Sequence, residues 1–365
     1  MRRQHRILPL VPVALILALA AVASAQVPDR LTDQEFWKLT ENISEPDGAF
    51  RSDNLLSNEM VFAHMLPEFL ANAKPGGVYM GVGPEQNFTY IAAMKAKMAF
   101  ITDIRRENLH LMLMYKAIFE LSKDRAEFIS LLFTKPRPDR LSANSPVTDI
   151  MAAYWEIPTA NESAYAANLE KIQSHLTKTR KIPLSLADVN GVAAVYRAFY
   201  WYGPAMNYSA SLTLTGFGGG SAATYRDLMT QSDAGGQFLT FLGSHEKFAY
   251  IKDLHARNLI VPVVGNFSGP RAIRGIGEYL TSRGVTVSAF YVSTVEPYLK
   301  RDGSFPTFCA NVATLPMDDS SVFVRPGNVG NLQNSGFAVP PLAPGAPRIG
   351  TYQLGVTVPM KTGCN

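Results

Sequence analysis

The stretch "GGVYMGVGPEQNFTYIAAM", residues 76–94, decides the fold. Two glycines lead into a short, wholly apolar run that begins at Val78, which is typical of a strand buried on both faces of a parallel sheet. The run ends in Gly81-Val82-Gly83, and Pro84 then suits the first turn of a helix, where its missing N–H group costs nothing. A strand, a glycine turn and a helix are therefore expected in succession.

The residues that follow extend this pattern. "KMAFITDI" predicts a second buried strand that ends at Asp103, and "RRENLHLMLMYKAIFELS" predicts a second helix. The resulting βαβα unit should have a right-handed crossover. Apolar runs at 259–264 and 285–292 predict two further strands around another helix. The sequence thus predicts an α/β fold with a Rossmann-like doubly wound sheet.

Composition and pattern divide the chain into segments. Residues 26–75 predict an N-terminal helical segment, 76–325 the Rossmann-like domain, and 326–365 a Pro/Gly-rich tail. Within the domain, about 123–245 is expected to be a largely helical insertion, in which we assign no strand; "GFGGG" (216–220) reads as a hinge or linker. We expect "TFCANVATLP" and "SSVFVR", just before residue 326, to close the sheet as an antiparallel pair.

The first 25 residues predict a cleavable signal peptide. Three arginines precede an apolar run, and Ala23-Ser24-Ala25 forms an A-x-A cleavage site. The apolar run is shorter than the roughly 20 residues that a membrane span needs, and two prolines interrupt it. We therefore expect a periplasmic or secreted protein with no stable membrane span after cleavage.

Charge and cysteine usage agree with export. The net charge of +4 falls to +1 without the three arginines of residues 1–25, so no basic face for nucleic acid is indicated. The only cysteines are Cys309 and Cys364, and an oxidising compartment permits them to pair. The alternative is a buried Cys309 and a free Cys364 near the end of the chain. Neither lies beside a histidine or in a C-x-x-C pair, which argues against cysteine catalysis.

The glycine turn is a candidate ligand site. Gly81 and Gly83 would let a ligand approach the backbone, and the start of the next helix offers free N–H groups. Asp103 ends the second strand about 20 residues later, where doubly wound folds place a ribose-binding carboxylate. These features predict a ligand with an adenosine group; a tight turn with no ligand is the alternative, because short glycine motifs are common.

The local charge favours one adenosine ligand over another. A dinucleotide fingerprint requires a third glycine where this chain has Gln86, and Glu85 would repel a pyrophosphate at the helix start. S-adenosylmethionine carries a cationic sulfonium and ammonium instead. We therefore expect Glu85 and Asn87, beside the two glycines, to belong to an S-adenosylmethionine pocket.

Two blocks of the sequence resemble a known family. "GGVYMGVGPEQNFTYIAAMKAKMAFITDIRRENL" and "NLIVPVVGNFSGPRAIRGIGEYL…VTVSAFYVSTVEPYL" are similar to an uncharacterised bacterial family, over most of residues 30–325. Its fold is described as like that of S-adenosylmethionine-dependent methyltransferases, of the class I Rossmann-like type. The resemblance implies first-turn roles for Gly81, Gly83 and Glu85, a ribose contact for Asp103 and a place near the reacting end for Asn266. The sequence after Asn266 lacks the prolines of amine methyltransferases, which counts against amine methylation.

Other candidates have a structural alternative. Asp103 is also placed to cap the helix after it, and Arg105 and Arg106 either bind a substrate anion or are solvated. Tyr202 belongs to an aromatic group that either lines a cleft or packs in the core, as dense aromatics more often do. The six histidines show no zinc-binding spacing and a G-x-S-x-G motif is absent, so we expect neither a metal site nor a hydrolase of that type.

Export and cofactor conflict, because S-adenosylmethionine should be scarce outside the cytoplasm. The sequence therefore leaves three hypotheses: an exported methyltransferase, a non-catalytic binding protein that reuses the fold, and an interaction protein of the cell envelope.

Overall fold

The computed structural model describes residues 26–364 apart from 60–61, 215–222, 234 and 329–352. The predicted signal peptide (1–25) and the predicted hinge (216–220) lie outside the described residues.

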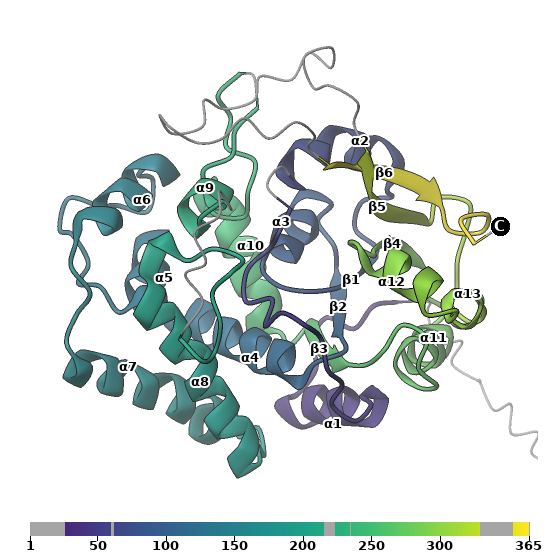
Figure 1. The fold of residues 1–365 in the computed structure, drawn as a ribbon, viewed down its shortest axis with the longest axis horizontal. Coiled ribbons are helices and arrows are strands. Elements are labelled where there is room, and N and C mark those ends of the chain that lie inside the picture. Colours follow the sequence, from purple (N-terminus) through teal and green to yellow (C-terminus); the bar gives the residue numbers. More distant parts are fainter. Residues whose placement is uncertain (1–25, 60–61, 215–222, 234, 329–352, 365) are drawn as a thin grey trace, which may run out of the picture.

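The centre of the fold is a six-stranded, mostly parallel sheet with the order β3-β2-β1-β4-β5-β6 (Figure 1). Strands β1 to β5 are parallel, and β6 runs antiparallel to β5 at one edge. The strands are β1 (Val78–Gly81), β2 (Met98–Asp103), β3 (Ile260–Val264), β4 (Val287–Tyr291), β5 (Val322–Asn328) and β6 (Gln353–Pro359).

Strands β1 to β4 are buried along their whole length, as their continuous apolar runs predict. The third strand in the chain is β3, so the sheet resumes only after the helical insertion. Strand order reverses between β1 and β4, because β3 and β4 lie on opposite sides of β1. This mixed α/β architecture is compatible with a Rossmann-like fold.

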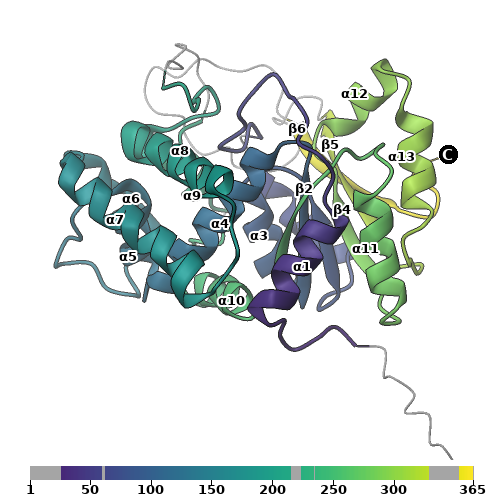
Figure 2. The same cartoon turned by 90° about the horizontal axis from the view of Figure 1, so that it is seen from below.

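Helices cover both faces of the sheet (Figure 2). One side carries α3 (Gln86–Ala93), α4 (Arg106–Leu121) and α10 (His245–Ala256), and the other carries α11 (Ala272–Thr281) and α13 (Phe305–Val312). Between β4 and α13 lies α12 (Val295–Arg301). A layer of helices on each face keeps both sides of the parallel strands dry.

The N-terminal segment is helical only in part. It contains α1 (Asp33–Ile43), a 3₁₀ turn (Phe62–Met65) and α2 (Leu66–Asn72). Residues 44–58, between α1 and the 3₁₀ turn, form neither helix nor strand; we call them the strap. The prediction of a helical segment over 26–75 is therefore wrong for the strap.

The insertion is helical, as predicted, and lies beside the sheet (Figure 1). Its helix α8 (Leu186–Tyr202) packs against α4 and so connects the insertion to the core. The insertion contains α5 (Arg125–Phe133), α6 (Val147–Glu156), α7 (Glu162–Ser174), a π-helical turn (His175–Thr179), α8 (Leu186–Tyr202), a 3₁₀ turn (Gly203–Ala205) and α9 (Tyr225–Met229).

The carboxyl-terminal end of the chain completes the sheet, which corrects two predictions. "TFCANV" is part of helix α13, because Phe305, Phe308 and Val312 recur at helical spacing, and the last two are buried. The antiparallel partner of β5 is β6, from the tail. Residues 353–359 of the tail are thus part of the sheet, although the Pro/Gly content of the tail indicates a loop.

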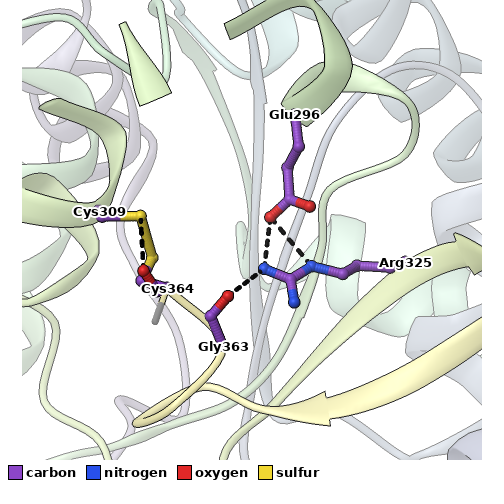
Figure 3. Close-up of a disulfide and its surroundings, with 5 residues drawn as sticks. All are labelled: Glu296, Cys309, Arg325, Gly363 and Cys364. Carbon is purple, nitrogen blue, oxygen red and sulfur yellow. Dashed lines mark hydrogen bonds and ion pairs between the residues drawn. A yellow bond between two sulfur atoms is a disulfide. The ribbon is translucent and has the colours of Figure 1, made fainter. Parts of the chain in front are cut away.

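A disulfide links Cys309 of α13 to Cys364, which confirms the pairing alternative (Figure 3). Nearby, Arg325 of β5 forms an ion pair with Glu296 of α12 and donates a hydrogen bond to the carbonyl of Gly363. Covalent and polar contacts therefore fix the last residues against α12 and α13.

Candidate functional site

A cavity of about 420 Å³ lies at the carboxyl ends of β1, β2, β3 and β4. Its lining includes Gly83 after β1, Asp103 at the end of β2, Asn266 after β3 and Ser293 after β4. In parallel α/β sheets, ligands bind at this edge, where the strand order reverses. The fold therefore puts a cavity where the sequence predicts a ligand site.

The structure brings together three of the predicted site residues. Gly83, Asp103 and Asn266 all line the cavity. The other six, among the described residues, are not part of its lining: Gly81, Glu85, Asn87, Arg105, Arg106 and Tyr202.

The turn after β1 depends on Gly83. Its φ angle is +81°, a left-handed backbone conformation that residues other than glycine rarely adopt. A Cβ atom here would meet Gln86 Nε2 at 3.3 Å and Asn54 Nδ2 at 3.4 Å. The amides of Gln86 and Asn54 therefore lie close to the turn that a ligand would approach.

Gln86 presents an unpaired acceptor. Its side chain lines the cavity, is 2% exposed and donates from Nε2 to the carbonyl of Val82 at 3.2 Å. Because that carbonyl can only accept, the orientation of the amide is fixed and Oε1 is the remaining atom. Within the described residues, Gln86 Oε1 has no hydrogen-bond partner. The turn therefore contains one buried acceptor that no described group satisfies.

Glu85 does not face the cavity, which corrects the charge argument. The residue is fully buried, and its Oε1 accepts a hydrogen bond from the backbone N–H of Ser57 at 3.3 Å. Burial raises the pKa of Glu85 to about 8, so the carboxyl is mostly neutral at pH 7. A buried, neutral acid cannot repel a pyrophosphate, and the distinction between the two adenosine ligands no longer rests on Glu85.

Gly81 and Asn87 stabilise the turn from behind. Asn87 donates from Nδ2 to the carbonyls of Val82, Gly83 and Pro84, and its Oδ1 accepts from the hydroxyl of Tyr79 at 2.8 Å. A Cβ atom on Gly81 would lie 2.0 Å from Asn87 Oδ1. Glycine at this position therefore makes room for the amide that satisfies the turn.

Asp103 is held by Arg105. The backbone N–H and Nε of Arg105 donate to Asp103 Oδ1 at 3.0 and 3.2 Å, and Nη2 donates to Oδ2 at 3.3 Å. Both side chains are about 5% exposed. Asp103 Oδ1 is saturated and one acceptor position remains on Oδ2. The carboxylate therefore cannot accept from both ribose hydroxyls while Arg105 stays in place.

Asn266 is oriented by its own loop and by the strap. Its Oδ1 accepts from the backbone N–H and the hydroxyl of Ser268, both at 2.9 Å. The backbone N–H of Asn266 donates to Glu45 Oε2 at 3.1 Å. Because the amide oxygen is used within the loop, Asn266 has its NH₂ group left to donate. Ser268 serves this loop and does not cap α11, whose N-cap residue is Arg271.

Arg106 and Tyr202 serve the packing of the insertion. Arg106 forms an ion pair with the buried Asp188 of α8 at 2.7 Å and a second with Glu41 of α1. Tyr202 ends α8, and its hydroxyl lies 3.4 Å from the backbone carbonyl of Ser211. Neither is placed to contact a ligand in this cavity.

The sequence prediction missed the strap as part of the site. Six of its residues line the cavity: Ala49, Phe50, Arg51, Asn54, Ser57 and Asn58. The strap follows the carboxyl edge of the sheet, since Glu45 N–H donates to Val264, Gly48 N–H donates to Ile104, and Arg105 donates to the carbonyls of Ser52 and Asp53. The sequence did offer one signal for the strap: residues 44–58 are rich in polar side chains and show no helical or strand periodicity.

The cavity is also lined by residues of α12 and the insertion. Tyr298, Arg301 and Asp302 come from α12 and the residue after it, and Tyr208 comes from the insertion. Among the described residues, no cluster of His, Cys, Asp and Glu could hold a metal ion. In the same part of the chain, no helix has the length and apolar character needed to cross a membrane.

Comparison with known proteins gives a family but no activity. No curated protein matches the chain. The model of one family, a domain of unknown function (DUF7790), matches residues 55–338 and so covers every strand end that lines the cavity. The chain belongs to this family, DUF7790.

Proposed function

We propose that the cavity binds a small adenosyl ligand, S-adenosylmethionine or a relative, and that the chain is a methyltransferase-like protein. One observation carries the proposal: Gly83, Asp103 and Asn266, from three different strand ends, line one cavity where strand order reverses. The cofactor would supply an activated methyl group. The protein would supply binding and orientation, which its lining of amides, hydroxyls and aromatic rings can provide.

The size and polarity of the cavity support a nucleoside-sized ligand. Its volume of about 420 Å³ is near the lower end of the roughly 300–1,000 Å³ range of ligand pockets. Gln86 and Asn54 lie over the turn where a dinucleotide would place its pyrophosphate. Gln86 Oε1 offers an acceptor to an amino or hydroxyl group, and the Asn266 amide offers a donor.

One observation favours a second candidate, a binding protein without methyl transfer. Asp103 is paired with Arg105 and has a single acceptor position left for a ribose. A full ribose contact would require Arg105 to move away from Asp103, and Arg105 also holds the strap. A ligand that uses only one hydroxyl, or none, would bind without this rearrangement.

Isothermal titration calorimetry on the protein lacking residues 1–25 tests the proposal. S-adenosylmethionine and S-adenosylhomocysteine should bind at micromolar concentration, and NAD should bind at least tenfold more weakly. Asp103→Asn should weaken binding about tenfold, since it removes a charged acceptor. Asp302→Asn, which alters another acid of the lining, should change affinity less than twofold. No heat and no thermal shift with either adenosyl compound would rule out the proposal.

A second variant is needed because Asp103→Asn leaves the buried Arg105 without its ion-pair partner and could therefore disturb folding. Gln86→Leu removes the unpaired acceptor of the cavity and introduces no buried charge. It should also weaken S-adenosylhomocysteine binding, by about fivefold, with the far-ultraviolet circular dichroism spectrum unchanged.

Export through a cleaved signal peptide is proposed as well. The Cys309–Cys364 disulfide supports it, because disulfides persist in oxidising compartments. Mass spectrometry of the protein isolated from its native cells should give an amino terminus at Gln26. A chain that still begins at Met1 would contradict the proposal.

A further inference from the structure

Two arginines lie against the ring of one tyrosine at the cavity, Tyr298. The guanidinium carbon of Arg51, from the strap, lies 5.5 Å from the ring centre of Tyr298, and that of Arg301 lies 5.0 Å from it. Phe50 packs edge-on against the same ring, with the ring centres 5.4 Å apart. All four residues line the cavity, and we call them the arginine–tyrosine cluster.

The charge of this cluster is not balanced. Arg51 has no salt bridge within the described residues, and Arg301 pairs only with its exposed neighbour Asp302. The one other acid of the lining, Asp103, is already neutralised by Arg105. The cluster therefore presents excess positive charge at a cavity wall, which favours an anion.

The cluster is also rich in exposed aromatic surface. Phe50 is 38% exposed and Tyr298 is partly exposed. Flat rings of this kind give contact area to another ring, while a guanidinium offers a fork of N–H donors that matches a carboxylate or phosphate. A ligand that combines an aromatic ring with an anionic group would use both.

The cluster lies on different elements from the residues assigned to the cofactor. Phe50 and Arg51 come from the strap, and Tyr298 and Arg301 come from α12 after β4, whereas Gly83, Asp103 and Asn266 follow β1, β2 and β3. One cavity therefore has two differently built sides. The two sides therefore offer different chemistry to whatever binds there.

We propose that the arginine–tyrosine cluster binds a small aromatic anion, and that this compound is the acceptor substrate. A nucleophilic oxygen or nitrogen of the anion would form the new bond to the methyl carbon as the S–CH₃ bond of the sulfonium breaks, which leaves S-adenosylhomocysteine, and the proton of the nucleophile would pass to water. Binding of the anion follows from the cluster alone. The role of acceptor rests on the proposed function. The anionic group is a carboxylate or a phosphate, and both would accept from Arg51 and Arg301.

Another arginine–tyrosine pair in the chain provides a matched control. Arg283 lies 4.6 Å from the ring centre of Tyr279 in α11, and neither residue lines the cavity. If a stacked arginine were no more than a common surface feature, Arg283 and Arg51 would be equivalent in binding experiments. The proposal requires them to differ.

The experiment measures the affinity of benzoate, phenyl phosphate and neutral benzamide by calorimetry. The two anions should bind, the tighter one identifying the anionic group, and benzamide should bind at least tenfold more weakly. Arg51→Gln and Arg301→Gln should each weaken anion binding about fivefold to tenfold, and Arg283→Gln should leave it unchanged. Affinity for the anions should also fall between 50 and 500 mM NaCl.

Three results would overturn the inference: benzamide binding as tightly as benzoate, anion binding that survives the Arg51→Gln, Arg301→Gln double variant, or an equal loss in Arg283→Gln. Both glutamine variants keep a polar side chain of similar length on a surface segment, so folding should be preserved.

S-adenosylhomocysteine titrated into the same variants separates this inference from the proposed function. Its affinity should fall by a smaller factor than that of benzoate in Arg51→Gln and Arg301→Gln. If S-adenosylhomocysteine never binds but benzoate binding depends on Arg51, the cavity is an anion site without the proposed cofactor. If S-adenosylhomocysteine binds and neither anion does, the inference fails and the proposed function stands.

Discussion

The turns after β1 and after β3 lie at the same edge of the sheet, and each places a glutamate beside the start of a helix. After β1 the acid is Glu85, the N-cap residue of α3, yet its side chain makes no cap and is buried behind the turn. After β3 the acid is Glu45, from the strap, which accepts from the backbone N–H groups of Asn266, Arg271 and Ala272. Glu85, which is adjacent to α3 in the sequence, is buried away from the start of that helix. Glu45, about 220 residues from the turn after β3, lies at the start of α11 instead.

This difference shows what an acid at a helix start needs. A carboxylate near free N–H groups is stabilised when its oxygens reach them. Glu45 does so with both oxygens, whereas Glu85 Oε1 accepts from the backbone N–H of Ser57 in the strap. The turn after β1 therefore has no carboxylate at its backbone N–H groups, whereas Glu45 accepts from the N–H groups of the turn after β3.

The largest expected effect concerns Glu85 and pH. Its pKa is raised to about 8 by burial, from 4.5 in an exposed chain. Between these values the folded state holds a proton that the unfolded state has lost, so the free energy of unfolding falls as pH rises from 4.5 and the loss is complete above pH 8. Glu85→Gln removes this loss. Between pH 4.5 and pH 8, its stability relative to the native protein should rise by about 1.4 kcal/mol per pH unit, roughly 5 kcal/mol in all.

Urea unfolding of both proteins between pH 5 and pH 8.5 measures that slope. Glu246→Gln is the control: Lys95 lowers the pKa of this exposed acid, so Glu246 is ionised in both states across the range and the variant should follow the native curve. Parallel curves for Glu85→Gln and the native protein would mean that Glu85 is charged and solvated, and the contrast between the turns would disappear.

The next effect concerns Glu45. Glu45→Ala leaves three backbone N–H groups without an acceptor, those of Arg271 and Ala272 at the start of α11 and that of Asn266 in the preceding loop. It should lower the free energy of unfolding by about 2–3 kcal/mol at pH 7. Glu45→Gln keeps one oxygen acceptor and should lower it by about 1 kcal/mol. A loss below about 0.5 kcal/mol in Glu45→Ala would mean that water replaces the carboxylate without cost.

Local patterns were sufficient for the four strands whose ends lie at the cavity. The apolar runs that became β1, β2, β3 and β4 are short, continuous and bounded by glycine or polar residues, and the glycine turn could be placed from Gly83. Asp103 followed as the residue at the end of a predicted strand, whereas Asn266 followed from the resemblance to the methyltransferase-like family. A cavity at this edge was therefore predictable from residues near each strand in sequence.

What could not be predicted depends on contacts between distant segments. Nothing near Asp103 in the sequence shows that Arg105 would hold it while also bonding the strap, because that geometry exists only after the strap is in place. The same holds for Glu45. Strand β6 was missed because a strand at the edge of a sheet takes its pairing from a partner, and the residues before it indicate a loop. Helix α13 was misread because a short apolar segment fits both periods.

A smaller effect tests the backbone of the first turn. Gly83→Ala puts a Cβ on a residue with φ of +81°, and Gly303→Ala does the same at +72° with no neighbour within 4 Å. Both should lose about 1–2 kcal/mol of stability, because the left-handed conformation is strained for alanine. Only Gly83→Ala should also weaken S-adenosylhomocysteine binding in calorimetry, by fivefold or more. An equal affinity in the two variants would show that the ligand does not approach this turn.

The smallest effect tests the turn after β3. Ser268→Ala removes one of the two hydrogen bonds to Asn266 Oδ1 and leaves the bond from the Ser268 backbone N–H. Stability should fall by about 0.5–1 kcal/mol, the net value of one neutral hydrogen bond. Because the backbone bond still holds the amide oxygen, the Asn266 NH₂ group should keep its orientation and adenosyl affinity should change less than twofold. A larger loss of affinity with the same small change in stability would mean that the hydroxyl contacts the ligand itself, and the third turn would then take part in binding as directly as the first.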